Sequence, residues 1–213
     1  MSRRSLIHRL SLFVSSRARR GQSLVEFTVM LPVLLIMISG LIEFGFMLNY
    51  YLDLIDAARD ATRWAAGDDP VHNLSGAWMD PNPLFYTRVQ QIATDAIDTG
   101  SGGQISLDVA TDDIVISSFS VSGGAITKRF PGGDCAGTGL PLYYNHTSDF
   151  TCAEVQALLD PAAPNTGIVL VEIWYDYHQI LGLPWITAFV PDPVTLYAYT
   201  MMPNPNVEPT PTP

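Results

Sequence analysis

The side chains of this chain that could do chemistry are few and widely separated. The four histidines form no His-x-x-x-His or similar metal-ligand spacing. No Gly-x-Ser-x-Gly motif, Walker loop or dinucleotide-binding fingerprint occurs. Two acidic pairs, Asp68-Asp69 and Asp112-Asp113, lack a complete calcium loop and are predicted to be turn residues. We therefore expect no enzyme, no metal site, no cofactor and no small-molecule substrate.

The two cysteines are Cys135 and Cys152, and no Cys-x-x-Cys motif occurs. In an exported domain, two cysteines that close a short loop containing Gly and Tyr favour a disulfide. Such a bond contributes roughly 3 kcal/mol in the chain-entropy account. The alternative is a pair of buried free thiols, and the disulfide is preferred if the domain is exported.

Two glutamates, Glu26 and Glu43, bracket the most apolar part of the chain, Leu24–Leu48, and no charged residue lies between Phe27 and Ile42. At about 1.5 Å per helical residue, this stretch is long enough to cross a hydrocarbon core. A cleaved signal peptide is the alternative, but its apolar region has only about 7–15 residues. The sequence therefore predicts a single-pass transmembrane helix in the lipid bilayer.

The charges are divided between the two sides of this helix. No acidic residue precedes Glu26. Because positive charge stays on the cytoplasmic side, we expect a cytoplasmic N-terminus and an extracytoplasmic C-terminal domain at the inner or plasma membrane. The acidic body, which carries all 21 acidic residues, would be repelled by phosphate backbones, so no nucleic-acid partner is expected. The basic residues of the head are Arg3, Arg4, Arg9, Arg17, Arg19 and Arg20.

A glycine stands between the basic head and the apolar helix. Gly21 is followed by Glu26 and Phe27, a pattern that resembles the class III signal of type IV prepilins. In that family the prepilin peptidase cuts after the glycine, which implies a cut between Gly21 and Gln22 here. Glycine suits such a site because it lets the backbone adopt an extended form in a narrow cleft. The alternative is a simple helix breaker. Pilins usually begin with an N-methylated Phe, whereas this mature chain would begin with Gln22.

Further motifs resemble the TadE-like family of tight adherence (Tad) pilus assembly over about residues 17–66. The resemblance implies a pseudopilin whose partners are the prepilin peptidase, other pilin-like subunits and the pilus assembly platform. It also implies that Glu26 contacts the Gln22 amine of a neighbouring subunit; the alternative is a carboxylate solvated at the headgroups. The shared motifs are Val25-Glu26-Phe27, Leu31-Pro32, Ile42-Glu43-Phe44-Gly45, Tyr50-Tyr51 and Ala57-Ala58-Arg59-Asp60-Ala61-Thr62-Arg63.

Two features near the outer end of the predicted span have alternative interpretations. Glu43 lies roughly 25 Å beyond Glu26 along a helix. Solvation at the outer interface is the simpler interpretation of Glu43, and a subunit contact with a partner helix is the alternative. The apolar segment 179–193 either folds over the core or dips into the headgroups or binds a partner.

The pattern beyond the span predicts an α+β fold, in which a long N-terminal transmembrane and amphipathic helix precedes a small antiparallel sheet of four or five strands packed on helices. The helix Leu84–Thr99 is predicted to bury Leu84, Val89, Ile92, Ala96 and Ile97. Gly123-Gly124 predicts a hairpin. Strands are predicted at 105–109, 114–121, 125–130, 168–177 and 194–201, with one or two helical turns at 153–159.

The chain is accordingly divided into a basic cytoplasmic leader (1–21), a transmembrane and extended helix (22–66), an extracytoplasmic α+β domain (67–202) and a disordered Pro/Thr-rich tail (203–213). The preferred function is a membrane-anchored, pseudopilin-like component of Tad/Flp-type pilus assembly and secretion. The alternative is a membrane-tethered extracytoplasmic domain that binds a ligand or partner through the loop around Cys135–Cys152 and has no pilus role.

Overall fold

The computed structural model describes residues 4–72, 76, 78–98, 100, 103–159 and 166–207, with only the backbone described for 4–21. These residues form two compact units. The first unit contains the chain up to Phe46 together with Gln179–Pro191, a segment that we call the return loop. The second unit contains Met47–His178 and the chain from Asp192 onward.

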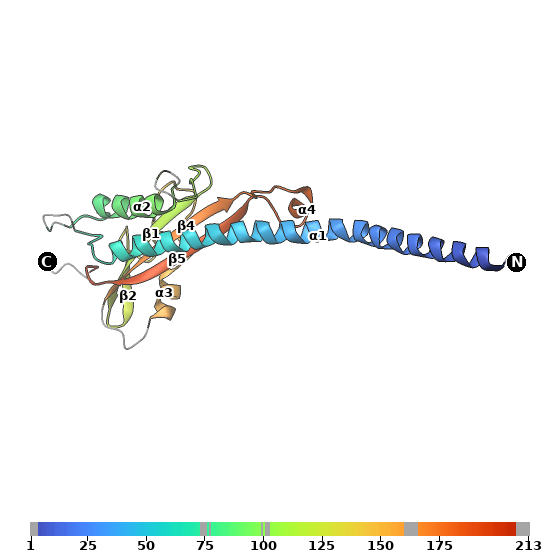
Figure 1. Ribbon diagram of the computed structural model, residues 1–213. Helices are drawn as coiled ribbons and strands as arrows, with labels where there is room; N and C mark the ends of the chain where they lie inside the picture. Colours follow the sequence, from blue (N-terminus) through green and yellow to red (C-terminus); the bar gives the residue numbers. More distant parts are fainter. Residues whose placement is uncertain are drawn as a thin grey trace. The chain divides into compact units, whose positions relative to one another are not determined.

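Helix α1 (Arg4–Ala65) includes Pro32 and begins earlier than the predicted start near Gln22 (Figure 1). The backbone of residues 4–21, the described part of the predicted leader, is therefore helical. Helix α1 ends where Gly67 and Asp68 donate backbone hydrogen bonds to Trp64 and Ala65. This end agrees with the predicted stop.

The second unit is built on a five-stranded antiparallel sheet with the order β2-β1-β4-β5, in which β3 also pairs with β1. The strands are β1 (Asp113–Ser122), β2 (Ala125–Phe130), β3 (Leu140–Pro141), β4 (Gly167–Tyr177) and β5 (Val194–Asn204). Gly123 and Gly124 have φ values of 62° and 75°. This left-handed backbone forms the predicted hairpin between β1 and β2 at little steric cost.

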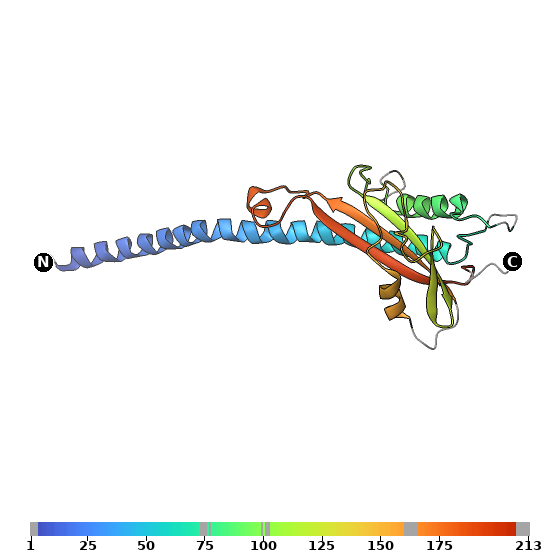
Figure 2. The same cartoon turned by 180° about the vertical axis from the view of Figure 1, so that it is seen from behind.

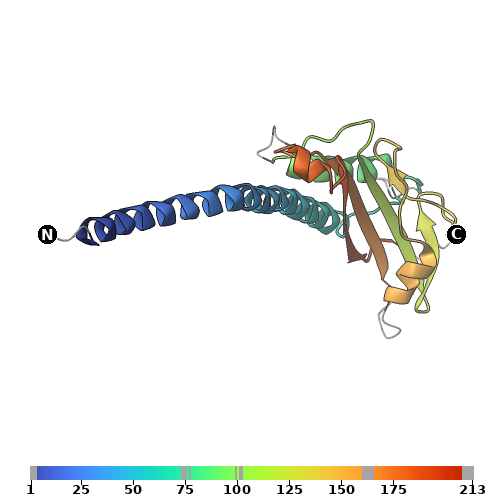
Figure 3. The same ribbon diagram turned by 90° about the vertical axis from the view of Figure 1, so that its right-hand side faces the viewer.

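The two faces of the sheet have separate cores. Alternate residues of β4, including Val169, Val171 and Ile173, pack with the alanine-rich part of α1 and with α2 (Pro83–Ile97), as the pattern predicts. Leu170 faces the opposite side, where it packs with Phe119 and with Val155 of α3 (Cys152–Leu158). Figure 3 shows α3 across the sheet from α1 and α2. The α+β fold is thus confirmed.

The predicted buried face of α2 is partly wrong. Val89 and Ile97 are buried as predicted, but Leu84 is exposed. The aromatic side chains of Phe85 and Tyr86 take the buried positions instead, because their larger apolar area stabilises the helix more when removed from water. Ala96 is exposed and Ile92 is half-buried.

A predicted strand at 105–109 is also wrong. Ile105 forms only an isolated bridge with Asp98, and Val109 is exposed in a turn. The backbone here turns because Asp108 and Asp112 accept local backbone hydrogen bonds, an alternative to a strand ladder. The short strand β3, by contrast, was not predicted.

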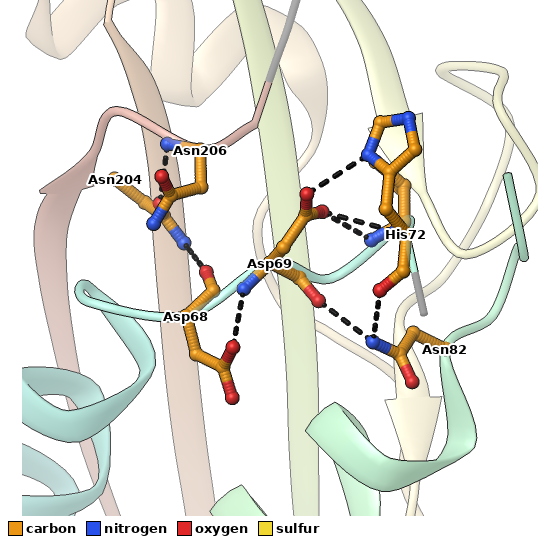
Figure 4. Close-up of polar contacts among 7 residues, drawn as sticks. Asp68, Asp69, His72, Asn82, Asn204 and Asn206 are labelled. Carbon is orange, nitrogen blue, oxygen red and sulfur yellow. Dashed lines mark hydrogen bonds and ion pairs between the residues drawn. The ribbon is translucent and has the colours of Figure 1, made fainter. Parts of the chain in front are cut away.

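Asparagine side chains fix the chain where α1 ends (Figure 4). The buried amide of Asn204 donates to the carbonyl oxygens of Ala65 and Asp68 at 2.9 Å each. The Asn82 amide donates to the Asp69 and His72 carbonyls, and its own carbonyl oxygen accepts from Leu84 N at the start of α2. Two of these bonds, to Ala65 O and from Leu84 N, use backbone groups that lie at helix ends and lack partners within the helix.

Residues 203–207, which the sequence assigns to a disordered tail, are ordered. Pro203 and Asn204 belong to β5, and Val207 is buried against Val71 and Phe130. Residues 208–213 lie outside the described part of the chain. The buried valine adds an apolar contact that keeps this segment on the domain.

Candidate functional site

The residues of the predicted processing motif lie on one uninterrupted stretch of α1. Gln22, Glu26 and Phe27 are exposed, and Gln22 Nε2 donates to Glu26 Oε1 at 3.1 Å. Gly21 lies among the residues described only by their backbone, which is helical there. The extended form expected for cleavage therefore requires local unwinding of the helix. A glycine lowers that cost by about 1 kcal/mol relative to alanine.

The surface of α1 beyond Glu26 is apolar and open. Within the described part of the chain, this is a helix long and apolar enough to cross a membrane, and its most apolar window is not buried by the protein. Large apolar side chains on several sides of the helix are exposed, including Met37, Leu41 and Phe44. Such a surface is stable in lipid rather than in water.

Glu43, in contrast, is buried, with 6% of its surface exposed. Its Oε1 accepts a hydrogen bond from Ile180 N at 2.9 Å and its Oε2 accepts one from Leu181 N at 2.8 Å. Both donors belong to the return loop and to the same unit as this part of α1. The carboxylate thus accepts hydrogen bonds from its own chain, which differs from the predicted solvation at the outer interface. A contact between Glu43 and another subunit stays a prediction.

The return loop makes a second contact one helical turn away. Trp185 Nε1 donates to Ser39 Oγ at 3.0 Å, and Ser39 Oγ in turn donates to Ile36 O. Trp185 lies on α4 (Pro184–Thr187), a short helix that Figures 1 and 2 both show beside α1. Gln179 Nε2 donates to the carbonyl oxygens of Val190 and Pro191, which closes the loop at its base. The apolar segment therefore folds against the predicted span.

The two cysteines form the expected disulfide in the second unit. The Cα atoms of Cys135 and Cys152 lie 5.7 Å apart, and the bond closes a sequence separation of 17 residues. Cys152 is the first residue of α3, so the bond ties the loop to that helix. The predicted disulfide is thereby supported.

An apolar groove opens elsewhere in the second unit. Its volume is about 820 Å³, and its walls come from α1, β5 and the region of α3. Its lining includes Tyr51 and Ile55 of α1 and Tyr199 and Met201 of β5. Neither Cys135 nor Cys152 lines this groove.

The carboxylates of both acidic pairs accept hydrogen bonds from backbone N–H groups. Asp113 is buried, and its carboxylate accepts hydrogen bonds from five backbone N–H groups at 2.8–2.9 Å. Asp112 accepts bonds from Asp108 N and Asp176 N. Among the described residues no group of three or more His, Cys, Asp or Glu side chains could hold a metal ion. The five donors to Asp113 are the N–H groups of Ile114, Leu142, Tyr143, Asn145 and His146.

A further buried acid, Glu172, was missed by the sequence interpretation. Its Oε1 accepts bonds from Asp149 N at 2.9 Å and from the Tyr197 hydroxyl at 2.7 Å. Arg129, also buried, donates to Ser117 Oγ and Phe150 O. Removal from water raises the pKa of Glu172, although its hydrogen bonds and the nearby Arg129 act in the opposite direction. Removal from water also lowers the pKa of Arg129. The signal available in the sequence was a charged residue inside the otherwise apolar run 168–174.

The raised pKa of Glu172 predicts a pH dependence. A carboxyl group that binds its proton more tightly in the folded state contributes most to stability at low pH, and this contribution is lost as pH rises above the ordinary value of 4.5. We expect the unfolding free energy of Glu172→Gln, measured relative to the wild type, to increase as pH rises from 4.5 toward neutral. Denaturant titrations of the full chain in detergent at several pH values measure this difference. The exposed change Asp95→Asn, measured in parallel, should show no such trend, and an equal trend in both variants would contradict the assignment.

Part of α1 also matches a known protein family. Residues 21–63 match the family model described as TadE-like protein. This segment is therefore similar to TadE-like proteins. The predicted resemblance is confirmed over these residues, which begin at Gly21 and include Glu26 and Glu43. Searches of curated proteins and of solved structures gave no match.

The TadE-like segment and the apolar helix together support a coarse assignment. The family indicates involvement in the Tad pilus system. One N-terminal apolar helix fits a single-pass membrane protein of that system, with membrane association and partners within it.

Proposed function

We propose that this protein is a membrane-anchored pseudopilin of Tad/Flp-type pilus assembly and secretion, which the prepilin peptidase cuts between Gly21 and Gln22. The observation that carries the proposal is the TadE-like match, which begins at Gly21, directly before an open apolar helix. The leader is cytoplasmic in this proposal and the second unit extracytoplasmic, because the arginines precede the span. The role is structural and involves no catalysis.

The proposed mechanism is packing of apolar helices with one polar contact that sets their register. An ionised carboxylate near hydrocarbon costs about 2–4 kcal/mol on insertion scales, so it needs a partner. Cleavage creates an α-amino group on Gln22, and Glu26 is exposed and available to the amine of a neighbouring subunit. The pilin-like subunits and the assembly platform are the partners of this surface.

The cleavage step has a direct test. We expect mass spectrometry of the membrane-extracted protein to find a mature chain that begins at Gln22. The variant Gly21→Ala should keep its leader, since a Cβ at this position hinders entry of the extended backbone and alanine stabilises the helix by about 1 kcal/mol.

A matched control is Gly40→Ala, a change within the same helix where an added Cβ would meet no atom within 4 Å. This variant should mature normally. A Gly21→Ala chain that loses residues 1–21 at the wild-type rate would contradict cleavage at this position.

The apolar groove favours a second candidate function, a tethered domain that binds a ligand or partner and has no pilus role. The groove is large enough for an apolar side-chain cluster or a small apolar ligand. Under this alternative the leader is a permanent part of the anchor, so the isolated protein begins at Met1 or Ser2. The same mass measurement therefore separates the two functions.

A further inference from the structure

The return loop is an apolar segment that places large side chains at its surface. Residues 179–191 contain no Asp, Glu, Lys or Arg. Phe189 is 89% exposed, and Ile180, Trp185 and Val190 are exposed as well. Burying one such side chain stabilises a protein by about 1.5–3 kcal/mol. A group of exposed apolar side chains therefore marks a surface that is covered by something apolar.

The hydrogen bond between Trp185 and Ser39 fixes the level of this loop on the helix. At about 1.5 Å per residue, Ser39 lies roughly 18 Å along the axis from Phe27, where the uncharged stretch begins. A hydrocarbon core about 30 Å thick that starts at Phe27 ends near Met47. Ser39 then lies inside the core, and a shift of one helical turn in either direction leaves it inside. Trp185 must lie at the same depth, since its indole nitrogen is 3.0 Å from Ser39 Oγ.

The polar groups of the loop and of the helix satisfy one another at this depth. Non-helical backbone in hydrocarbon needs acceptors for its N–H groups, and an acidic side chain there needs donors. Glu43 supplies acceptors to Ile180 N and Leu181 N, and these donors in turn satisfy its two oxygens. The Trp185 indole and the two carbonyl groups bound by Gln179 are also paired within the same unit.

We propose that the return loop is a second membrane-inserted element, which enters the bilayer beside α1 from the side of Phe46 and buries Trp185 and Phe189 among acyl chains. Glu43 is the acceptor that holds the loop at this depth. The occupant of the exposed apolar surface is lipid, because the loop is continuous with the lipid-exposed surface of α1 and carries no charge. This inference rests on α1 spanning a membrane and not on cleavage at Gly21.

Tryptophan quenching in vesicles tests the proposal. The full chain is reconstituted in phosphatidylcholine vesicles whose acyl chains are brominated either near the headgroup or near the methyl end. We expect bromine on the acyl chains to quench a fraction of the tryptophan emission. The variant Trp185→Phe should lose most of the emission that bromine quenches. Trp78→Phe is a matched control, since Trp78 is 42% exposed and Trp185 40% exposed on the protein, but Trp78 belongs to the second unit. It should leave the bromine-quenchable part unchanged and remove emission quenched by aqueous acrylamide.

Two results would overturn the proposal that the return loop is inserted in lipid. One is quenching of Trp185 by acrylamide to the same extent as Trp78, which would place the loop in water. The other is protection of Trp185 from both bromine and acrylamide, which would place it against protein, such as a second copy of the chain. Flotation of the vesicles with the protein is checked first, because failure to float would refute the span itself and not the position of the loop.

The role of Glu43 has its own readout. Glu43→Ala leaves two loop N–H groups without their acceptor, so we expect the loop to move toward the headgroups. Quenching of Trp185 by bromine near the methyl end should fall, and quenching by bromine near the headgroup should rise. Glu26→Ala, at the other end of the span, should change neither. Equal depth profiles for Glu43→Ala and the wild type would overturn the assignment of Glu43 as the acceptor that sets loop depth.

Discussion

Replacing Asp113 with alanine is expected to lower the unfolding free energy of the second unit by about 3–5 kcal/mol. The carboxylate accepts three backbone hydrogen bonds on Oδ1 and two on Oδ2, and the residue is fully buried. Hydrogen bonds to a charged acceptor contribute about 1.5–3 kcal/mol each. The loss is smaller than their sum because the segment 142–146 is partly exposed, so water can reach some of the released donors.

Chemical unfolding of the full chain in detergent measures this loss, and tryptophan emission gives a local readout. The His146 ring stacks on Trp174 with centroids 5.1 Å apart. Release of the 142–146 segment should remove this contact and change the emission of Trp174 before global unfolding. Asp113→Asn keeps one carbonyl oxygen as an acceptor and should fall between alanine and the wild type. An unfolding free energy for Asp113→Ala within 0.5 kcal/mol of the exposed control Asp95→Ala, about the usual scatter of surface changes, would contradict the role of Asp113.

Removing the disulfide is expected to lower the unfolding free energy by about 3 kcal/mol, because the unfolded chain regains the freedom of the closed loop. The bond joins Cys135 and Cys152 across 17 residues. The double variant Cys135→Ser/Cys152→Ser also loses apolar packing, since Cys152 packs against the cluster of Phe119, Val155 and Leu170. We therefore expect the double variant to be somewhat less stable than the reduced wild-type protein.

Reduction separates the two contributions. Adding a thiol reductant to the wild type should lower the denaturant midpoint, whereas the double variant should not respond to it. Cys135 is exposed, so Cys135→Ser tests loop closure with little change in packing. If the reduced and oxidised wild-type proteins unfold at the same midpoint, the loop contributes no constraint and the expectation is wrong.

Local patterns in the sequence were enough to predict much of the fold. The alternation of apolar residues predicts the two faces of β4, and Gly123-Gly124 predicts the hairpin, because both signals come from neighbouring residues. The errors fall where the choice depends on distant residues. The buried face of α2 was misplaced because Phe85 and Tyr86 compete with Leu84 for one core.

The polar contacts were less accessible to sequence reasoning. Asp113 was predicted to be a turn residue, but its donors include residues about 30 positions away in the chain. Glu43 was predicted to be a polar residue of the outer interface, yet it accepts hydrogen bonds from backbone N–H groups that are 137 and 138 positions away. No local period encodes such pairs. The trace that such a contact can leave in the sequence is an acid within an apolar run, as with Glu172 in residues 168–174 of β4.

Because α1 runs without a break through Gly21, cleavage there would change the electrostatics of the chain that remains. Scission of one peptide inside a running helix produces a fresh amino end whose first four N–H groups have lost their acceptors. That end also bears about half a positive elementary charge from the aligned peptide dipoles, besides the charge of the amine itself. A carboxylate of an adjacent molecule would therefore meet a stronger attractive field than the amine alone provides. An uncut precursor would offer no such field. Cleavage itself would therefore favour the association of a subunit with its neighbours.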